Sequence, residues 1–179
     1  PSEILIVADG GSDPRCLAAD MLSQAEHDRV AAAVLVTDSE GLARQTAQEI
    51  EKQLASLPRR DIARASIDGF GKIIVCDSVA QAIDIANRIA PEHLELCLDQ
   101  PFDYLDRVHN AGSVFLGRSC PEALGDYFSG PNHTLPTMGT ARFSSPLSVD
   151  DFVKKTQFSY YTQEALNRAA NKVALFARA

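Results

Sequence analysis

A glutamate and a histidine stand side by side at Glu92-His93, directly after a predicted helix that ends before Pro91. These two side chains are the ones most readily tuned for proton transfer near neutral pH. Neighbouring residues of an extended segment point to opposite faces, so adjacency alone favours an ordinary solvated helix end. The pair becomes a candidate for acid–base chemistry only through other polar residues of the chain.

Gln24 and His27 are three residues apart on a predicted helix, so both side chains project from one face. They are able to share a metal ion, but a histidine in the last helical turn also suits the helix dipole without any ligand, and spacing alone favours that reading. Asp126 and His133, in a late irregular segment, add a hard oxygen and a second imidazole. Gln24, His27 and Asp126 would be a nitrogen and oxygen set for Zn²⁺ with room for a substrate or another ligand, although glutamine is an unusual zinc ligand.

Several other function classes lack their signals. The sequence has no G-x-G-x-x-G, P-loop or G-x-S-x-G motif. With 24 acidic and 17 basic residues the formal net charge is −7, which argues against sequence-independent binding of nucleic acid or of an anionic membrane. The four cysteines have no C-x-x-C spacing, which favours a reducing cytoplasm, and no apolar run reaches the roughly 18 residues that span a bilayer.

Apolar runs alternate with helical patterns along most of the chain. Strands are predicted at residues 4–8, 31–37, 71–77 and 112–117, with a short apolar segment at 94–98 and weak strand character at 63–67. Helix starts are predicted at Asp13-Pro14, Asp38-Ser39 and Ser78, with later helices at 152–156 and from Gln163. This alternation predicts an α/β fold, with a mostly parallel sheet covered by helices on both faces.

Residues 119–146 form a long irregular stretch rich in glycine and proline, and they carry Asp126, His133 and Arg142. Loops of this length in a compact domain are usually functional or disordered. The aromatic residues Tyr127 and Phe128 argue against disorder, so we expect the stretch to contribute to a site.

Six segments, in this order, resemble the histidinol dehydrogenase family. They are residues 1–9 (PSEILIVAD), 19–27 (ADMLSQAEH), 90–95 (APEHLE), 111–117 (AGSVFLG), 121–127 (PEALGDY) and 129–137 (SGPNHTLPT). The resemblance spans nearly the whole chain, and its length makes it far more specific than any single motif. Pro131 stands where the family pattern has a threonine, beside His133.

The resemblance implies a zinc-dependent oxidation of L-histidinol through the aldehyde to L-histidine, with two NAD, in histidine biosynthesis. His93 is expected to take the proton of the alcohol, and Glu92 to activate water at the aldehyde stage. The zinc is expected to hold the amino and imidazole nitrogens of histidinol. The remaining expected roles are zinc and substrate contacts by Gln24, His27 and Asp126, and substrate contacts by Ser2, His93 and His133.

The chain resembles only the second half of the family's enzyme. The expected architecture is therefore an incomplete Rossmann-like three-layer unit at residues 1–147, followed by C-terminal helices at 148–179. The NAD-binding domain would lie upstream, so no cofactor-binding residue is expected in this chain. A further zinc histidine and a glutamate that reaches the partner subunit would lie downstream. We expect the intact enzyme to be a cytoplasmic homodimer and the isolated chain to show no turnover and weakened zinc binding.

A second hypothesis belongs to another class of protein. The chain would be a stand-alone metal- or partner-binding α/β module with no catalytic role. Such a module needs Gln24, His27 and Asp126 to bind metal without further ligands. Tight, stoichiometric zinc binding by the isolated chain favours the module, whereas weak binding favours the enzyme fragment.

Overall fold

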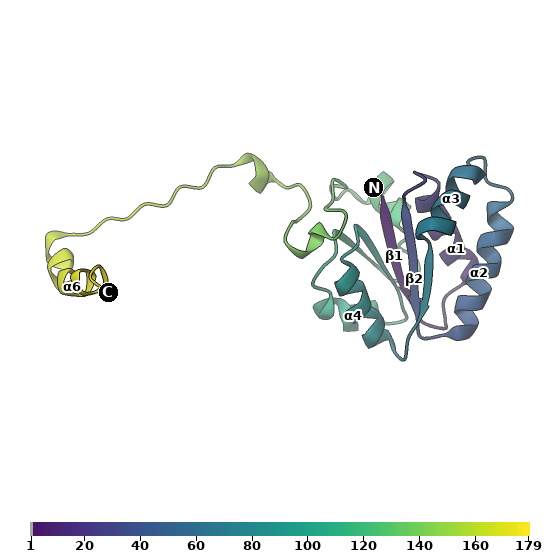
Figure 1. The fold of residues 1–179 in the computed structure, drawn as a ribbon, viewed down its shortest axis with the longest axis horizontal. Helices are drawn as coiled ribbons and strands as arrows, with labels where there is room; N and C mark the ends of the chain where they lie inside the picture. Colours follow the sequence, from purple (N-terminus) through teal and green to yellow (C-terminus); the bar gives the residue numbers. More distant parts are fainter. Residues whose placement is uncertain (1) are drawn as a thin grey trace. The chain divides into compact units, whose positions relative to one another are not determined.

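One sheet of five parallel strands organises the part of the chain that the computed structural model describes, residues 2–179. Its strand order is β3-β2-β1-β4-β5, and Figure 1 shows β1 beside β2. The strands are β1 (Glu3–Ala8), β2 (Ala32–Thr37), β3 (Lys72–Val75), β4 (His93–Cys97) and β5 (Ser113–Leu116). The predicted α/β fold with a parallel sheet is thereby confirmed.

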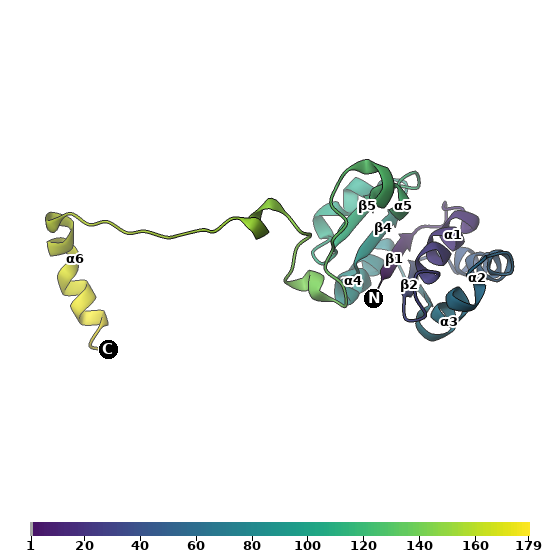
Figure 2. The same cartoon turned by 90° about the horizontal axis from the view of Figure 1, so that it is seen from above.

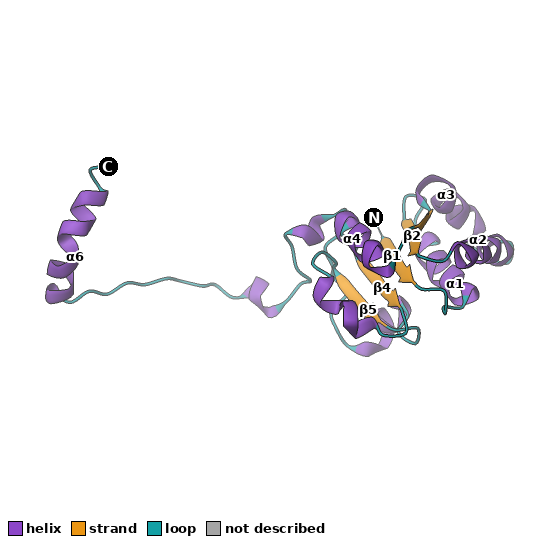
Figure 3. Ribbon diagram, turned by 90° about the horizontal axis from the view of Figure 1, so that it is seen from below, coloured by secondary structure: helices purple, strands orange, loops and turns teal. Residues whose placement is uncertain are grey.

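Helices cover both faces of this sheet. One face carries α1 (Pro14–Ala25), α2 (Glu40–Leu54) and α3 (Arg60–Phe70), and the other carries α4 (Val79–Ile89) and the 3₁₀ segment η1 (Pro101–Arg107). Figures 2 and 3 show the two groups on opposite sides of the strands. Side chains alternate along a strand, so Ile4 and Ile6 pack towards α1 while Leu5 and Val7 pack towards α4. Burial on both faces explains the continuous apolar runs of the sequence.

Three predicted helix starts are confirmed by their caps. The Asp13 side chain accepts a hydrogen bond from Arg15 N at 2.9 Å, and Pro14 is the first helical residue of α1. Ser39 and Ser78 cap α2 and α4 in the same way, each accepting a hydrogen bond of 3.2 Å from the backbone three residues on. Each cap satisfies a backbone N–H that has no partner within its helix.

The weak strand predicted at residues 63–67 is wrong, because these residues lie within α3. Ala63 and Ser66 are both fully buried and are three residues apart, a spacing that only a helix places on one face. The Ser66 hydroxyl donates to Ala31 O at 2.8 Å and fixes the helix to the start of β2. Packing against the sheet therefore outweighed the local strand preference of Ile67, the one β-branched residue of this segment.

The short helix predicted at residues 152–156 is also wrong. A 3₁₀ turn, η4 (Val149–Phe152), precedes it, and residues 153–162 carry no helix or strand within the described chain. A helix of five residues is not stable in water without tertiary packing, and the side chains in this segment are largely exposed.

The contacts divide the chain into two units, Pro1–Ser148 and Val149–Ala179, whereas the sequence placed the boundary after residue 147. The second unit contains η4 and α6 (Gln163–Phe176). Thr162 caps α6 by accepting a hydrogen bond of 3.2 Å from Ala165 N, so the predicted start of this helix is confirmed. Among the described residues, no helix combines the length and hydropathy that crossing a membrane requires.

Candidate active site

The Glu92-His93 pair lies at the turn from α4 into β4. Ala90, which is fully buried, adopts φ +57° and ends α4, and His93 is the first residue of β4. The carbonyl of Glu92 accepts a hydrogen bond of 2.9 Å from Ser113 N. A Cβ on Gly112 would lie only 2.5 Å from that carbonyl oxygen, so the glycine permits this close approach. The pair is thus fixed at the amino end of the strands.

The His93 ring is 5% exposed and has a defined tautomer. Its Nδ1 lies 2.9 Å from the carbonyl oxygen of Glu3. A carbonyl oxygen only accepts hydrogen bonds, so Nδ1 carries the proton and the neutral ring keeps its lone pair on Nε2. Nε2 lies 3.9 Å from Glu122 Oε1. The geometry therefore leaves an unprotonated nitrogen directed at the acidic side chains of the next segment.

Glu92 is held by the same residue of β1. Its Oε2 accepts a hydrogen bond of 3.0 Å from Glu3 N and lies 3.7 Å from His93 Nδ1. Burial raises the pKa of Glu92, and the nearby His93 opposes that shift. Glu3 thus contacts both members of the pair, its N–H binding Glu92 and its carbonyl binding His93.

His93, Glu122 and Asp126 bring their ligand atoms within 4.8 Å of one another, which suits a metal ion. Glu122 is the first residue of the short helix α5 (Glu122–Leu124), and Asp126 lies in the single π-helical turn η2 (Gly125–Ser129). Burial, followed by a hydrogen bond with Asp126, raises the pKa of Glu122 to about 7. Among the histidine, cysteine, aspartate and glutamate side chains of residues 2–179, this is the one group with such geometry.

Two contacts fasten the segment that carries Asp126 to the sheet. Glu95 Oε1 accepts a hydrogen bond of 2.8 Å from Glu122 N. Gly125 lies directly against Phe115 of β5, where an added Cβ would be 2.2 Å from the ring atom Cε1. Single turns of π-helix are frequent at functional sites, and this one places Asp126 close to His93.

Buried acidic groups lie behind this site. Glu95 is fully buried on β4, two residues from His93 and hence on the same face of the sheet. Burial, the Asp20 carboxyl and Glu122 raise the pKa of Glu95 to about 8, so this side chain is largely neutral at pH 7. Burial also raises the pKa of Asp20, on α1, to about 6.

Gln24 lies one helical turn beyond Asp20 on α1. Because α1 runs antiparallel to the strands of its β-α-β unit, this turn is nearer than Asp20 to the amino ends of the strands. Gln24 is 2% exposed, and its Oε1 has no hydrogen-bond partner among the described residues. A buried carbonyl oxygen without a partner is rare and marks a place that a ligand or ion would satisfy. Gln24 and Asp126 therefore fit the predicted zinc set.

The other predicted site residues, His27, Ser2 and His133, are not part of the group formed by His93, Glu122 and Asp126. His27 is exposed past the end of α1 and is outside the group formed by His93, Glu122 and Asp126. Ser2 directly precedes Glu3 and is half-buried. His133 is exposed and, with Asp126, lines a cavity of about 220 Å³ next to Phe115.

Sequence reasoning assigned no role to Glu122, Glu95 or Asp20. Glu122 lies within a family motif but carries no distinctive spacing of its own. Glu95 had a usable signal, because a carboxyl group interrupts the otherwise apolar segment 94–98. Charged side chains are almost never fully buried without a partner, so this position pointed to a special environment.

The opposite end of the sheet is closed by Arg118. In doubly wound sheets ligands bind at the carboxyl ends of the strands where the strand order reverses, which in this sheet is between β1 and β4. The guanidinium of Arg118 fills that position, donating to Ser12 Oγ at 3.1 Å and pairing with Asp9 and Asp99. Asp9 in turn accepts hydrogen bonds from Gly11 N and Asp99 N. The Asp9 carboxylate thus occupies backbone N–H groups of the kind that bind the phosphates of a nucleotide.

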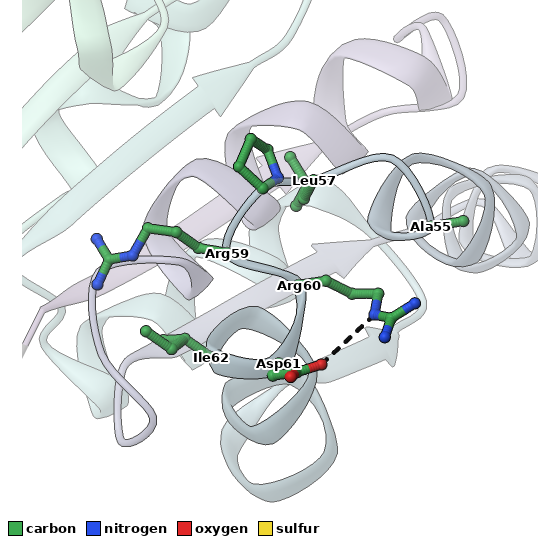
Figure 4. A pocket seen from close by; sticks show the side chains of 7 residues that line it. Ala55, Leu57, Arg59, Arg60, Asp61 and Ile62 are labelled. Atoms are coloured by element: carbon green, nitrogen blue, oxygen red, sulfur yellow. Dashed lines mark hydrogen bonds and ion pairs between the residues drawn. The ribbon is translucent and has the colours of Figure 1, made fainter.

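A second cavity, of about 410 Å³, lies between the end of α2 and the start of α3 (Figure 4). Arg60 and Asp61 of its wall pair with each other at 3.5 Å. None of the candidate site residues lines this cavity. The smaller cavity, in contrast, is lined by two candidate site residues, Asp126 and His133.

Comparison with known proteins shows the family of this chain. The family model described as Histidinol dehydrogenase matches residues 1–179. The chain belongs to the histidinol dehydrogenase family. A histidinol dehydrogenase of Geobacter metallireducens is 54% identical over 177 residues, and one of Clostridium acetobutylicum is 52% identical. A crystal structure of histidinol dehydrogenase from Elizabethkingia anophelis superposes with a TM-score of 0.92 at 42% identity, covering 99% of this chain.

The match covers only part of these relatives. The chain spans 41% of the length of the two curated histidinol dehydrogenases, and 41% of the chain in the crystal structure. Family membership is therefore established for this segment, whereas the activity of the whole enzyme is a proposal.

Proposed function

We propose that this chain supplies the acid–base pair and most of the zinc-binding side chains for NAD-linked oxidation of L-histidinol to L-histidine. The observation that carries the proposal is the hydrogen bond between His93 Nδ1 and Glu3 O, which leaves Nε2 free to accept a proton. The family resemblance supplies the substrate, the histidine-biosynthesis pathway and a cytoplasmic homodimer for the intact enzyme.

His93 acts as the base of the first oxidation. Its Nε2 takes the hydroxyl proton of the alcohol as the aldehyde forms, and the resulting imidazolium is stabilised by the buried acidic groups around it, Glu122 at 3.9 Å and Glu92 at 3.7 Å. The Nδ1–H bond to Glu3 O holds the ring in place throughout.

Glu92 serves the second oxidation. Its partly buried carboxylate takes a proton from water as the water adds to the aldehyde. Burial raises the pKa of Glu92 and so makes it a stronger base than an exposed glutamate. The hydride acceptor NAD has no assigned site in this chain, so the residues of this chain account for the proton transfers alone.

Gln24, His27 and Asp126 would hold the zinc ion. The buried and unpartnered Gln24 Oε1 and the position of Asp126 beside His93 support two of these ligands. His27, which is exposed, is assigned from the family resemblance alone. When bound, zinc supplies fixed positions for the amino and imidazole nitrogens of the substrate. The set contains only nitrogen and oxygen ligands, as zinc sites that also bind substrate commonly do.

Ligand-observed NMR tests the proposal with the 179-residue chain. L-Histidinol should bind in the presence of zinc and lose binding when the metal is removed with a chelator. Asp126→Asn should abolish the zinc-dependent binding of L-histidinol. Asp103→Asn, on η1, is a matched control that should leave this binding unchanged. The proposal is contradicted if L-histidinol binds equally well with and without zinc, or if Asp126→Asn leaves its binding unchanged.

A stand-alone metal-binding module remains the second candidate, favoured by the compact grouping of His93, Glu122 and Asp126 within this one chain. It differs from the enzyme segment in a measurable way. A module binds zinc tightly whether or not L-histidinol is present, whereas the enzyme segment binds zinc weakly and gains affinity from the substrate.

A further inference from the structure

A buried carboxyl group without a role in the proposed chemistry stands beneath the site. Glu95 is fully buried at the middle of β4, in register with Ile6 of β1 and Phe115 of β5. Its Oε1 accepts a hydrogen bond from Glu122 N, and its Oε2 lies 3.8 Å from Cys97 Sγ. None of Glu95, Cys97 and Glu122 lines the cavity beside Asp126.

We infer that Glu95 is a positioning residue, whose carboxyl group fixes the first residue of α5 and thereby sets Glu122 and Asp126 opposite His93. The inference rests on the zinc-site part of the proposed function. It adds a determinant of that site which is neither a ligand nor a member of the acid–base pair.

Glu95 provides an acceptor that the start of α5 otherwise lacks. Glu122 N is the first N–H of α5, and such groups have no acceptor within their own helix. Glu122 is buried, so water cannot supply the missing acceptor, and an unpaired buried N–H is costly. Glu95 Oε1 supplies it and joins two segments that are 27 residues apart in the chain.

This hydrogen bond fixes the acidic side chains of the site relative to β4. Glu122 Oε1 lies 3.9 Å from His93 Nε2, and Asp126 follows four residues later in the continuous helical run of α5 and η2. His93 and Glu95 share one strand and one face, so the same rigid element carries the base and the anchor. A shift of the α5 start moves Glu122 and Asp126 together relative to His93.

Other contacts do not replace the bond between Glu95 and Glu122. The segment from Arg118 to Pro121 has no strand pairing. Gly125 contacts the Phe115 ring, and it can do so only because glycine has no side chain. The Gly125 contact limits how near the segment comes to β5. The Glu95 bond sets its position along β4.

The test compares Glu95→Gln and Glu95→Ala in the 179-residue chain. Glutamine has the same shape and keeps an acceptor oxygen for Glu122 N, whereas alanine removes it. Ser66→Ala is the matched control, because it deletes another buried hydrogen bond, that to Ala31 O, far from the site in α3. Two readouts are used: zinc affinity by calorimetry, and hydrogen exchange of the Glu122 amide by NMR.

Glu95→Ala should weaken zinc binding by about tenfold or more, as the loss of residues that orient metal ligands does. Glu95→Gln should stay within about threefold of the unchanged chain, and Ser66→Ala should leave affinity unchanged while lowering stability. Full zinc affinity in Glu95→Ala, or an equal loss in Glu95→Ala and Ser66→Ala, overturns the inference.

The amide readout separates this inference from the proposed function. If the unchanged chain binds no zinc, the zinc-site proposal fails, but the Glu122 amide still reports on Glu95. Protection that is kept in Glu95→Gln and lost in Glu95→Ala supports the positioning role. Protection that is the same in all three chains contradicts it.

Discussion

The carboxyl group of Glu95 and the backbone N–H of Glu122 are joined by a hydrogen bond of 2.8 Å. Through it, β4 holds both the His93 imidazole and the segment that carries Asp126. The site therefore lies at the amino ends of the strands, while the carboxyl ends, where doubly wound sheets usually bind ligands, are filled by Arg118.

The buried acids predict that stability falls as pH rises. Burial raises the pKa values of Asp20, Glu95 and Glu122 to about 6, 8 and 7, so the folded state holds protons that the unfolded state has already lost. Between about pH 4.5 and 8 the unfolded state binds fewer protons, and a fully shifted group such as Glu95 then lowers the free energy of unfolding by about 1.4 kcal/mol per pH unit.

Urea denaturation at a series of pH values measures this slope. Glu95→Gln should remove the contribution of Glu95, flattening the curve and raising stability at about pH 8 relative to the unchanged chain. Below about pH 4.5 the two chains should have nearly equal stability, since both side chains are then neutral. Parallel curves for the two chains would show that Glu95 titrates at its ordinary pKa.

Gly125→Ala should be destabilising through a clash with the Phe115 ring. An alanine Cβ would lie 2.2 Å from Phe115 Cε1, and overpacking of this kind costs about 1–3 kcal/mol. Phe115→Leu combined with Gly125→Ala should recover part of that loss, as measured by thermal denaturation of the unchanged chain, the two single variants and the double variant. Additive effects of the two changes would mean that Gly125 does not press on this ring.

The fold was largely predictable from the sequence, but two elements and the inner part of the site were not. Continuous apolar runs and capping residues such as Asp13 and Ser78 identified strands and helix starts because both signals are local. Residues 63–67 were mistaken for a strand because packing against the sheet, which is non-local, decides their conformation. Glu95 was missed for the same reason, since its partner Glu122 lies 27 residues further along the chain.

Arg118→Ala should lower stability and leave the site intact. Arg118 ties together the loops at the carboxyl ends of the strands through Ser12, Asp9 and Asp99, and hydrogen bonds to charged groups contribute about 1.5–3 kcal/mol. The side chain is partly exposed, so the measured loss should lie towards the lower value and shrink in high salt. Chemical denaturation at two salt concentrations checks this, with zinc affinity as the second reading. A loss of zinc affinity would contradict the separation of the two sheet ends.

The tautomer of His93 is open to direct observation. Nitrogen-15 NMR of the imidazole should show a protonated Nδ1 and an unprotonated Nε2 in the neutral ring, because Glu3 O accepts a hydrogen bond at Nδ1. His109, in a loop, provides the comparison within the same chain. A neutral His93 that carries its proton on Nε2 would be unable to act as the base from that nitrogen.

Zinc titration by calorimetry, with and without L-histidinol, tests the central claim most directly. We expect one weak zinc site per chain, tightened by L-histidinol, and lost in both Asp126→Asn and Gln24→Leu. Zinc binding that is equal in the unchanged chain and in these variants, or that does not respond to L-histidinol, would contradict the assignment of this site.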